Sequence, residues 1–271
     1  LSSSSAASDV YKRQAGSDAS AIRTTAERVD GGYLLNGTKQ FITNGGVADI
    51  YTIIALTDKS KGARGASAFI VEKGTPGFTF GKKEKKMGIR SSSTSELVFH
   101  DCLVPEENVI GRPGMGFIMA MKLLDKSRPG VASQALGIAQ GALEAAYDYV
   151  HDRVQFGTSL LNQPVVQNML AEMAVQVEAA RALIYASARF ADGGAKNITE
   201  SSAMSKIFAS DVAMKVTTDA VQLCGGAGYM KDYPVEKMMR DAKITQIYEA
   251  SNQVLRDAVA AELRKRKART E

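Results

Sequence analysis

The apolar residues of this chain change their spacing once, near Met115, and this change limits the folds that the chain can adopt. From Thr24 to about Val109 they form short runs rich in β-branched and aromatic residues, separated by Gly, Asn, Asp and Pro. From Met115 onward they recur every three or four residues. Short runs between turn residues are typical of β-strands, whereas the longer spacing is typical of amphipathic helices. The sequence therefore predicts a β domain followed by a helical domain.

Six apolar runs are candidate strands of the β domain: GYLLNG, KQFIT, DIYTIIAL, SAFIVE, GFTF and SELVFHDCLV. In ERVDGGYLL, Asp-Gly-Gly separates two such stretches, which predicts a hairpin. The turn residues between the runs supply the backbone conformations that reverse the chain. We therefore expect an all-β domain in this half.

Three apolar stripes predict long helices in the second half, at Val131, Ala135, Ile138, Ala142, Ala146 and Val150, then Val166, Met169, Met173, Val177 and Ile184, then Met204, Ile207, Val212, Val216 and Leu223. Pro129 and Pro164 stand where helices can start, and a last helix is expected from about Ser251 to Arg266. Glycine pairs at 193–194 and 225–226 are expected to end helices. Short connections between long helices favour an antiparallel bundle.

The first fourteen residues, LSSSSAASDVYKRQ, show neither spacing. We expect residues 1–14 to be a non-native leader and exclude them from the fold. The rest of the chain has no apolar run of the length that a membrane helix needs and no signal-peptide pattern at its start, which predicts a cytoplasmic protein.

Charge and metal-ligating residues argue against several classes of function. The net charge is +5 and is spread along the chain, with local excess only in GKKEKKMG and RKRKAR, so nucleic-acid binding is not expected. The chain has two cysteines and two histidines, and they show no metal-ligand spacing. We expect no metal site, and we expect Cys102 and Cys224 to be buried thiols in a reducing compartment.

Five segments combine small residues with hydrogen-bonding side chains: AGSDAS, FITNGG, RVQFG, QLCGGAGY and QIYEASNQV. Such segments let a backbone approach a ligand, although none is specific alone. QLCGGAGY also fits a helix end with glycine in the left-handed conformation. Glu249 also fits an ordinary charge on a helix surface.

Together these segments resemble the acyl-CoA dehydrogenase family, in particular its short- and medium-chain members. DKSRPGVA, TDAVQLCGGAGY and YPVEKMMRDAKITQIYEASNQ are similar to whole blocks of that family, and the likeness runs from Ala15 to the last helix. The resemblance implies an α+β fold with an N-terminal helical domain that is missing here. It implies an antiparallel, β-barrel-like middle domain over residues 15–112 and an antiparallel four-helix-type bundle over residues 113–271.

The resemblance assigns the chemistry to Glu249, which matches the catalytic base of the family. A carboxylate in a dry pocket can remove the proton α to a thioester, and the hydride from the β carbon then passes to a flavin. In the family, the backbone N–H of the same glutamate polarises the thioester carbonyl. Some relatives carry the carboxylate base at the position of Ser127 instead. A serine cannot act as that carboxylate, so the role falls to Glu249.

The resemblance also implies an FAD site. The matched residues are Gly16, Ser17, Phe41, Ile42, Thr43, Arg153, Gln155, Phe156, Gln222, Gly226, Ala250, Ser251, Asn252 and Gln253. Tryptophan usually stands at the position of Phe41, so the fit to the flavin ring differs there. Arg153, Gln155, Phe156, Gln222 and Gly226 match residues that reach the FAD of a neighbouring subunit. A homo-oligomer, a dimer of dimers, is therefore implied.

Acyl-CoA contacts are implied at Ser17, Asp125, Lys126, Ser127, Arg128 and Glu249. Asp125 and Arg128 equally fit an ion pair between residues three apart on a helix. In DKSKGARG, Lys61 or Arg64 fits a contact to the CoA 3′-phosphate, as well as ordinary solvated charge. A family glutamine aligns with Pro164 and leaves Gln163 one place early, which puts one contact to the neighbouring FAD in doubt.

We therefore expect an FAD-dependent dehydrogenase of fatty-acid β-oxidation that oxidises a short- or medium-chain acyl-CoA to trans-2-enoyl-CoA and passes electrons to an electron-transfer flavoprotein. Two alternatives stay open: an acyl-CoA oxidase on the same fold, and an inactive fragment that serves as an oligomerisation or binding module. Peroxide release separates the first from a dehydrogenase, and flavin absorbance of the purified chain separates the second. The sequence does not indicate the acyl chain length, because the floor of the implied pocket depends partly on the missing N-terminal domain. Gly130, Val131 and Gly137 fit that floor and ordinary helix packing equally well.

Overall fold

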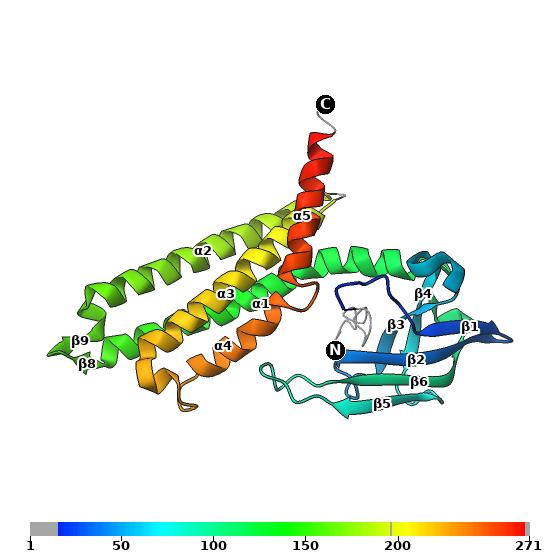
Figure 1. Ribbon diagram of the computed structural model, residues 1–271, viewed down its shortest axis with the longest axis horizontal. Helices are drawn as coiled ribbons and strands as arrows, with labels where there is room; N and C mark the ends of the chain where they lie inside the picture. Colours follow the sequence, from blue (N-terminus) through cyan, green and yellow to red (C-terminus); the bar gives the residue numbers. More distant parts are fainter. Residues whose placement is uncertain (1–15, 196, 269–271) are drawn as a thin grey trace. The chain divides into compact units, whose positions relative to one another are not determined.

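The computed structural model describes residues 16–195 and 197–268, which form two compact units. The first unit runs up to Leu124 without residues 87–89, and the second contains Met87–Ile89 and the chain from Asp125 onward. The first is built around a sheet and the second around helices, and each has its own apolar core (Figure 1). The predicted α+β fold class is therefore confirmed. The expected leader, residues 1–14, lies outside the described residues.

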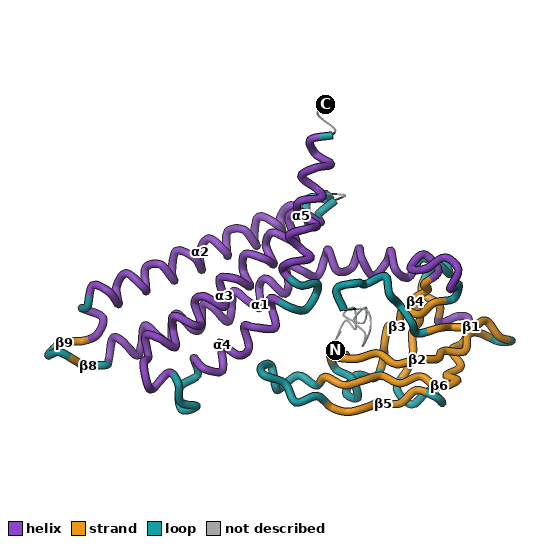
Figure 2. Tube along the Cα trace, in the orientation of Figure 1, coloured by secondary structure: helices purple, strands orange, loops and turns teal. Residues whose placement is uncertain are grey.

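The sheet of the first unit has seven strands in the order β5-β6-β2-β1-β3-β4-β7 (Figure 2). Every neighbouring pair is antiparallel except β1 and β3, which are parallel. The strands are β1 (Thr25–Val29), β2 (Gly32–Thr43), β3 (Ile50–Leu56), β4 (Ala66–Glu72), β5 (Phe78–Lys83), β6 (Thr94–Pro105) and β7 (Val109–Ile110).

The predicted hairpin is confirmed, because β1 and β2 pair up to Val29 and Gly32 around a tight turn at Asp30 and Gly31. The two expected runs GYLLNG and KQFIT form one strand, β2, instead of two. The strand stays continuous because Gly37, Thr38 and Lys39, where the two runs join, pair in regular register with β6, and register shifts fall only on either side of them. One of these shifts spans Phe41, which has a left-handed φ of 58°.

The sheet curls around an aromatic core. The rings of Tyr51 on β3 and Phe78 on β5 meet edge to face with centroids 5.1 Å apart, although three strands separate β3 from β5 in the sheet order. Tyr33 and Phe69, on β2 and β4, meet in the same way at 5.2 Å. Strands so far apart in a flat sheet could not share one core, so the barrel-like expectation agrees with this curvature.

The second unit is an antiparallel helix bundle, as predicted. Its helices are α1 (Gly116–Asp152, whose first residues belong to the other unit), α2 (Pro164–Asp192), α3 (Thr199–Gly228), α4 (Val235–Lys243) and α5 (Asn252–Lys267). Consecutive long helices reverse direction over short connections (Figure 1). A small hairpin of β8 (Val154–Gln155) and β9 (Thr158–Ser159) joins α1 to α2. No helix among residues 16–195 and 197–268 combines the length and the apolar character that crossing a bilayer requires.

Helix boundaries follow the predicted signals except at Pro129. Pro164 is the first residue of α2 and Gly193 is its C-cap, while α3 breaks at Gly225, whose φ is 55°. Pro129, expected at a helix start, lies inside α1 instead. The helix continues through it because apolar side chains are buried both before it, at Leu124, and after it, at Ala132.

Both cysteines are free and buried, as predicted. Burial raises the pKa of the Cys102 thiol to about 11 and also raises the pKa of Cys224. A thiol with a raised pKa is poorly nucleophilic, so neither cysteine is a candidate nucleophile.

Candidate active site

Glu249 lies in the short segment between the 3₁₀ helix Ile244–Gln246 and helix α5. Glu249 and Ala250 both adopt left-handed backbone angles, with φ of 52° and 73°. This conformation costs an L-residue about 1–2 kcal/mol because its Cβ crowds the following carbonyl. The hydroxyl of Ser251 accepts a hydrogen bond from the N–H of Val254 at 3.4 Å and caps α5. The turn is therefore strained and requires support from its surroundings.

The carboxylate of Glu249 is half-buried and accepts a hydrogen bond from Ser127 on α1. The Ser127 Oγ lies 2.6 Å from Glu249 Oε2. Burial raises the pKa of Glu249, whereas the Ser127 hydrogen bond and the positive charges of Arg128 and Lys206 lower it. A carboxylate that is partly removed from water has a higher affinity for a proton, and a hydrogen-bond donor fixes its orientation. Both properties are those of a general base.

Ser127→Ala is expected to shift the pH dependence of catalysis. The substitution removes the hydrogen bond that lowers the pKa of Glu249, so this pKa rises further. The base that the resemblance assigns to Glu249 can take up a proton only as the ionised carboxylate, so the acid limb of the kcat/KM profile is expected to move to higher pH. Ser133→Ala on the same helix is the matched control, since the Ser133 hydroxyl contacts only the Pro129 carbonyl among the bonds found for it. Superimposable profiles for Ser127→Ala and the unmodified chain would refute this role.

The neighbouring residues on α1 form an internal ion pair. Arg128 is buried and donates to Asp125 one turn earlier, and Thr199 Oγ1 donates to the second Asp125 oxygen at 2.7 Å. The ion-pair interpretation of Asp125 and Arg128 is thus confirmed. The Nε of Arg128 is buried without a hydrogen-bond partner among the described residues, which leaves one donor for a ligand. Lys126 is exposed.

Lys206 on α3 is the functional candidate that the sequence analysis missed. Its side chain is fully buried, and its Nζ donates to the carbonyl of Ala250 at 2.9 Å. Burial, joined by the charge of Arg128, lowers the pKa of Lys206 to about 7, while Glu249 and Asp211 act in the opposite direction. A signal for its burial exists, because Lys206 shares the helical spacing of the buried residues Ala209, Ala213, Val216 and Ala220.

Ser251, Asn252 and Gln253, which follow Ala250, are placed differently from one another. Asn252, expected at the cofactor, is 2% exposed, and its amide donates to Ser210 and Asp211 at 2.8 Å each. Its side chain is therefore committed to α3, so only its backbone is left for a ligand. Ser251 is half-buried and Gln253 is exposed.

Five other predicted cofactor residues gather at the β8–β9 hairpin and the C-terminal part of α3. Both segments lie at the same end of the helical unit (Figure 1), and Tyr149 and Tyr233 meet there edge to face at 5.3 Å. Phe156 is 92% exposed with a left-handed φ of 55°. A Cβ added to Gly226 would meet no atom within 4 Å, so its backbone is open to a ligand. All five are exposed: Arg153, Gln155, Phe156, Gln222 and Gly226.

The predicted cofactor residues of the sheet unit differ in exposure. Gly16 and Ser17 are exposed, and Phe41 is 59% exposed. Thr43 is half-buried, which leaves its hydroxyl within reach of a ligand. Ile42 belongs to the core of the sheet, so only its backbone can face a ligand.

Backbone strain coincides with the predicted site residues. Seven non-glycine residues of the described chain have positive φ, and Phe41, Phe156, Glu249 and Ala250 are four of them. Such strain concentrates at functional sites, where the surroundings hold it.

The remaining expectations concern single loops. Lys61 pairs with Asp58 at 2.8 Å, and Lys61 and Arg64 line a cavity of about 410 Å³ together with Arg28. Gln163 is the N-cap of α2, but its side chain makes no capping hydrogen bond. Its place one residue before the helix agrees with the departure noted in the sequence.

Comparison with known proteins identifies the family. The acyl-CoA dehydrogenase middle domain matches residues 9–102, and the acyl-CoA dehydrogenase C-terminal domain matches residues 114–264. The chain therefore belongs to the acyl-CoA dehydrogenase family, whose members are FAD-dependent.

Individual relatives match over nearly the whole chain. It is 57% identical over 241 residues to the short-chain specific acyl-CoA dehydrogenase of Megasphaera elsdenii, which covers 89% of this chain and 63% of the relative. It superimposes on butyryl-CoA dehydrogenase from Megasphaera elsdenii with a TM-score of 0.92 at 53% identity, covering 94% of this chain and 67% of that one. A chain in the structure of the electron transferring flavoprotein of Acidaminococcus fermentans matches with the same TM-score and coverage at 55% identity. The chain thus spans about 63% of the length of the curated relatives.

Proposed function

We propose that this chain carries the site for FAD-dependent oxidation of a short- or medium-chain acyl-CoA to trans-2-enoyl-CoA. The observation that carries the proposal is the half-buried carboxylate of Glu249, held on a strained turn and hydrogen-bonded by Ser127. The substrate class follows the relatives, which are named for short-chain and butyryl-CoA substrates.

In this proposal Glu249 removes the proton α to the thioester carbonyl, because burial makes its carboxylate more basic than a solvated one. The backbone N–H of the same residue donates to the thioester oxygen as negative charge develops there. The buried guanidinium of Arg128, with its unpaired Nε, and the hydroxyl of Ser17 bind the acyl-CoA. Asp125 orients Arg128 rather than the substrate, since both of its carboxylate oxygens accept hydrogen bonds within the unit.

FAD, when bound, would supply the hydride acceptor for the β carbon of the substrate. The hydroxyl of Thr43 and the backbone of Ile42 would hold the flavin ring, with the exposed ring of Phe41 in place of the usual tryptophan. Ser251 and Gln253 would hold the phosphate and adenine end, where the free N–H groups at the start of α5 favour an anion.

We also infer that the working form is a homo-oligomer, a dimer of dimers. Asn252 is bonded to Asp211, and Gln222 lies eleven residues further along α3, or about 16 Å at 1.5 Å per residue. The two groups of cofactor residues thus lie at different levels of one helix, which favours a cofactor shared by two subunits. The 92% exposure of Phe156 supports a partner at that end.

The proposed electron acceptor is an electron-transfer flavoprotein, and the similar chain in the structure of such a flavoprotein supports this choice.

A cytoplasmic location is proposed because both cysteines are buried free thiols, which suits a reducing compartment.

The proposed function is tested with the purified chain supplemented with FAD. The expected result is flavin absorbance that stays with the protein through gel filtration and bleaches on addition of butyryl-CoA without oxygen. Reduction of a dye or of electron-transfer flavoprotein without peroxide release marks a dehydrogenase, whereas peroxide release marks an oxidase. Protein that elutes without flavin contradicts the proposal for this chain. The remaining interpretation is then an inactive fragment that serves as an oligomerisation or binding module.

A further inference from the structure

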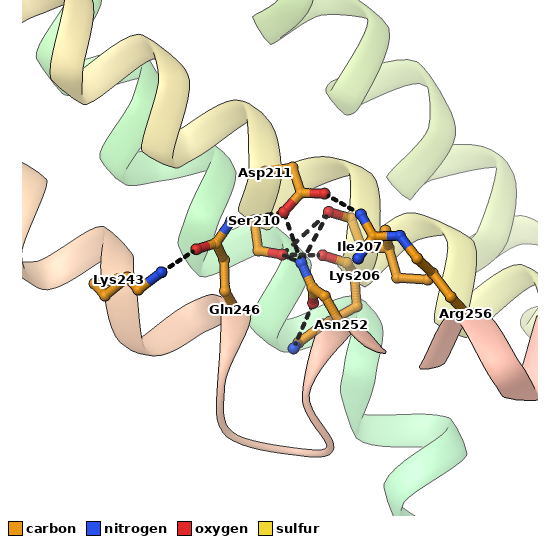
Figure 3. Close-up of polar contacts among 8 residues, drawn as sticks. All are labelled: Lys206, Ile207, Ser210, Asp211, Lys243, Gln246, Asn252 and Arg256. Carbon is orange, nitrogen blue, oxygen red and sulfur yellow. Dashed lines mark hydrogen bonds and ion pairs between the residues drawn. The ribbon is translucent and has the colours of Figure 1, made fainter. Parts of the chain in front are cut away.

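One face of α3 packs against the segment that carries Glu249, and its central residue is the buried Lys206. The Nζ of Lys206 donates to the carbonyl of Ala250 at 2.9 Å. It also donates to the Oδ1 of Asn252 at 2.9 Å (Figure 3). Ala250 is one of the two left-handed residues of the turn, and Asn252 is the first residue of α5. The amine therefore joins α3 both to the turn and to the helix that follows it.

Asp211 accepts hydrogen bonds from residues on both sides of the turn. Before the turn, Gln246 Nε2 donates to Asp211 Oδ1 at 2.6 Å. After it, Asn252 Nδ2 donates to the same oxygen at 2.8 Å, and Arg256 Nη2 donates to Oδ2 at 2.6 Å (Figure 3). Asp211 thus holds the flanks, while Lys206 supplies a hydrogen bond from α3 to the backbone of the turn itself.

A fully buried lysine needs an explanation, because removing an ammonium group from water is costly unless it finds partners. Joining α3 to α5 does not require this lysine, since Asn252 and Arg256 already bind α3 without it. What Lys206 adds is a hydrogen bond to the carbonyl of a residue in an unfavourable conformation. Strained backbone persists only where such contacts hold it.

We propose that Lys206 is a positioning residue for the catalytic base: its bond to the Ala250 carbonyl fixes the left-handed turn that directs Glu249 toward Ser127. The part concerning turnover rests on the proposed function, whereas the part concerning the turn does not. Glu249 stays aligned only while the backbone of residues 249 and 250 stays left-handed.

The first test is amide hydrogen exchange of the flavin-free chain. In Lys206→Met, amides of residues 247–251 are expected to exchange roughly 10-fold faster, while those of α1 and α4 change less than about twofold. Lys215→Met is the matched control on α3, where the lysine is half-exposed and pairs with Asp219. Unchanged exchange at residues 247–251, or equal acceleration throughout the helical unit, would overturn the proposal.

A second variant keeps the test decisive if Lys206→Met does not fold. Lys206→Gln retains a polar side chain with a donor, but this side chain is one atom shorter and does not reach the Ala250 carbonyl. The same local acceleration, roughly 10-fold, is expected. Exchange at the level of the unmodified chain would count against the proposal.

Ala250→Gly provides a rescue that a general structural role does not predict. Glycine adopts the left-handed conformation without the clash of a Cβ, so the turn no longer depends on Lys206. In the Ala250→Gly background, Lys206→Met is expected to accelerate exchange at residues 247–251 by less than about threefold. Equal acceleration in both backgrounds would show that Lys206 does not act through the strain of the turn.

Turnover then tests the link to catalysis. Lys206→Met is expected to lower kcat with butyryl-CoA by about 10- to 100-fold with little change in KM, because a misplaced base slows the chemical step and leaves binding intact. A rise in KM at unchanged kcat would contradict a positioning role. If the unmodified chain shows no turnover, the proposed function fails, while the exchange experiments still decide the role of Lys206 in the turn.

Discussion

Glu249→Gln is expected to lower the rate of butyryl-CoA oxidation by about 10²- to 10⁴-fold or more, while FAD stays bound. The amide has nearly the same shape as the carboxylate but cannot accept the α-proton. It can still accept the hydrogen bond from Ser127, so the turn and the pocket are expected to persist. The change thus removes the base and little else.

The measurement is the rate of flavin bleaching after anaerobic mixing with butyryl-CoA, together with the flavin to protein absorbance ratio. Glu144→Gln on α1 is the matched control, because Glu144 is exposed and bonded only to Gln140 among the contacts found for it. Bleaching of the Glu249→Gln flavin at the unmodified rate would remove Glu249 from the mechanism. Loss of flavin from this variant alone would instead assign the residue to cofactor binding.

Arg128→Met is expected to lower the free energy of unfolding by about 3–5 kcal/mol. Arg128 is buried against Asp125, whose side chain is 24% exposed. Removing the guanidinium leaves a poorly hydrated carboxylate with only the Thr199 hydroxyl as a partner. Because the charge of Arg128 also lowers the pKa of Glu249, this pKa is expected to rise in the variant.

Urea unfolding followed by circular dichroism measures the loss. The double variant Arg128→Met/Asp125→Leu is expected to be more stable than Arg128→Met, since it leaves no unpaired charge behind. The control is Lys215→Met, which breaks the surface pair with Asp219 and is expected to cost about 0–1 kcal/mol. A loss for Arg128→Met no larger than that of the control would show that the Asp125 pair does not stabilise the helical unit.

Much of the candidate site was accessible from the sequence because its signals are local. The glycine in QLCGGAGY predicted a break, and α3 breaks at Gly225. The segment QIYEASNQV was assigned through its resemblance to the family, and its backbone strain appears at Glu249 and Ala250. Both features depend on a few consecutive residues, which is the range over which sequence patterns are informative.

The part of the site that could not be predicted from the sequence is the set of contacts that its buried polar side chains make. The sequence analysis did not select Lys206, which bonds to Ala250, 44 residues away. The resemblance implied a cofactor contact for Asn252, whereas its side chain is buried and bonded to α3. The helical spacing of Lys206 indicates a buried face, but the acceptors and donors that a buried lysine or asparagine meets depend on what the fold brings to it, and no local pattern states these partners.

By itself, the sequence determined that a sheet unit precedes a helical unit, through the spacing of its apolar residues. Its turn residues determined where a hairpin turns and where most helices begin and end, because secondary structure follows such short-range signals. The tertiary structure alone decided that Pro129 lies within a continuous helix, that Arg128 is buried against Asp125, and that Lys206 supports the turn of Glu249. These outcomes rest on contacts between distant segments, whose gain in burial and hydrogen bonding outweighs local preference.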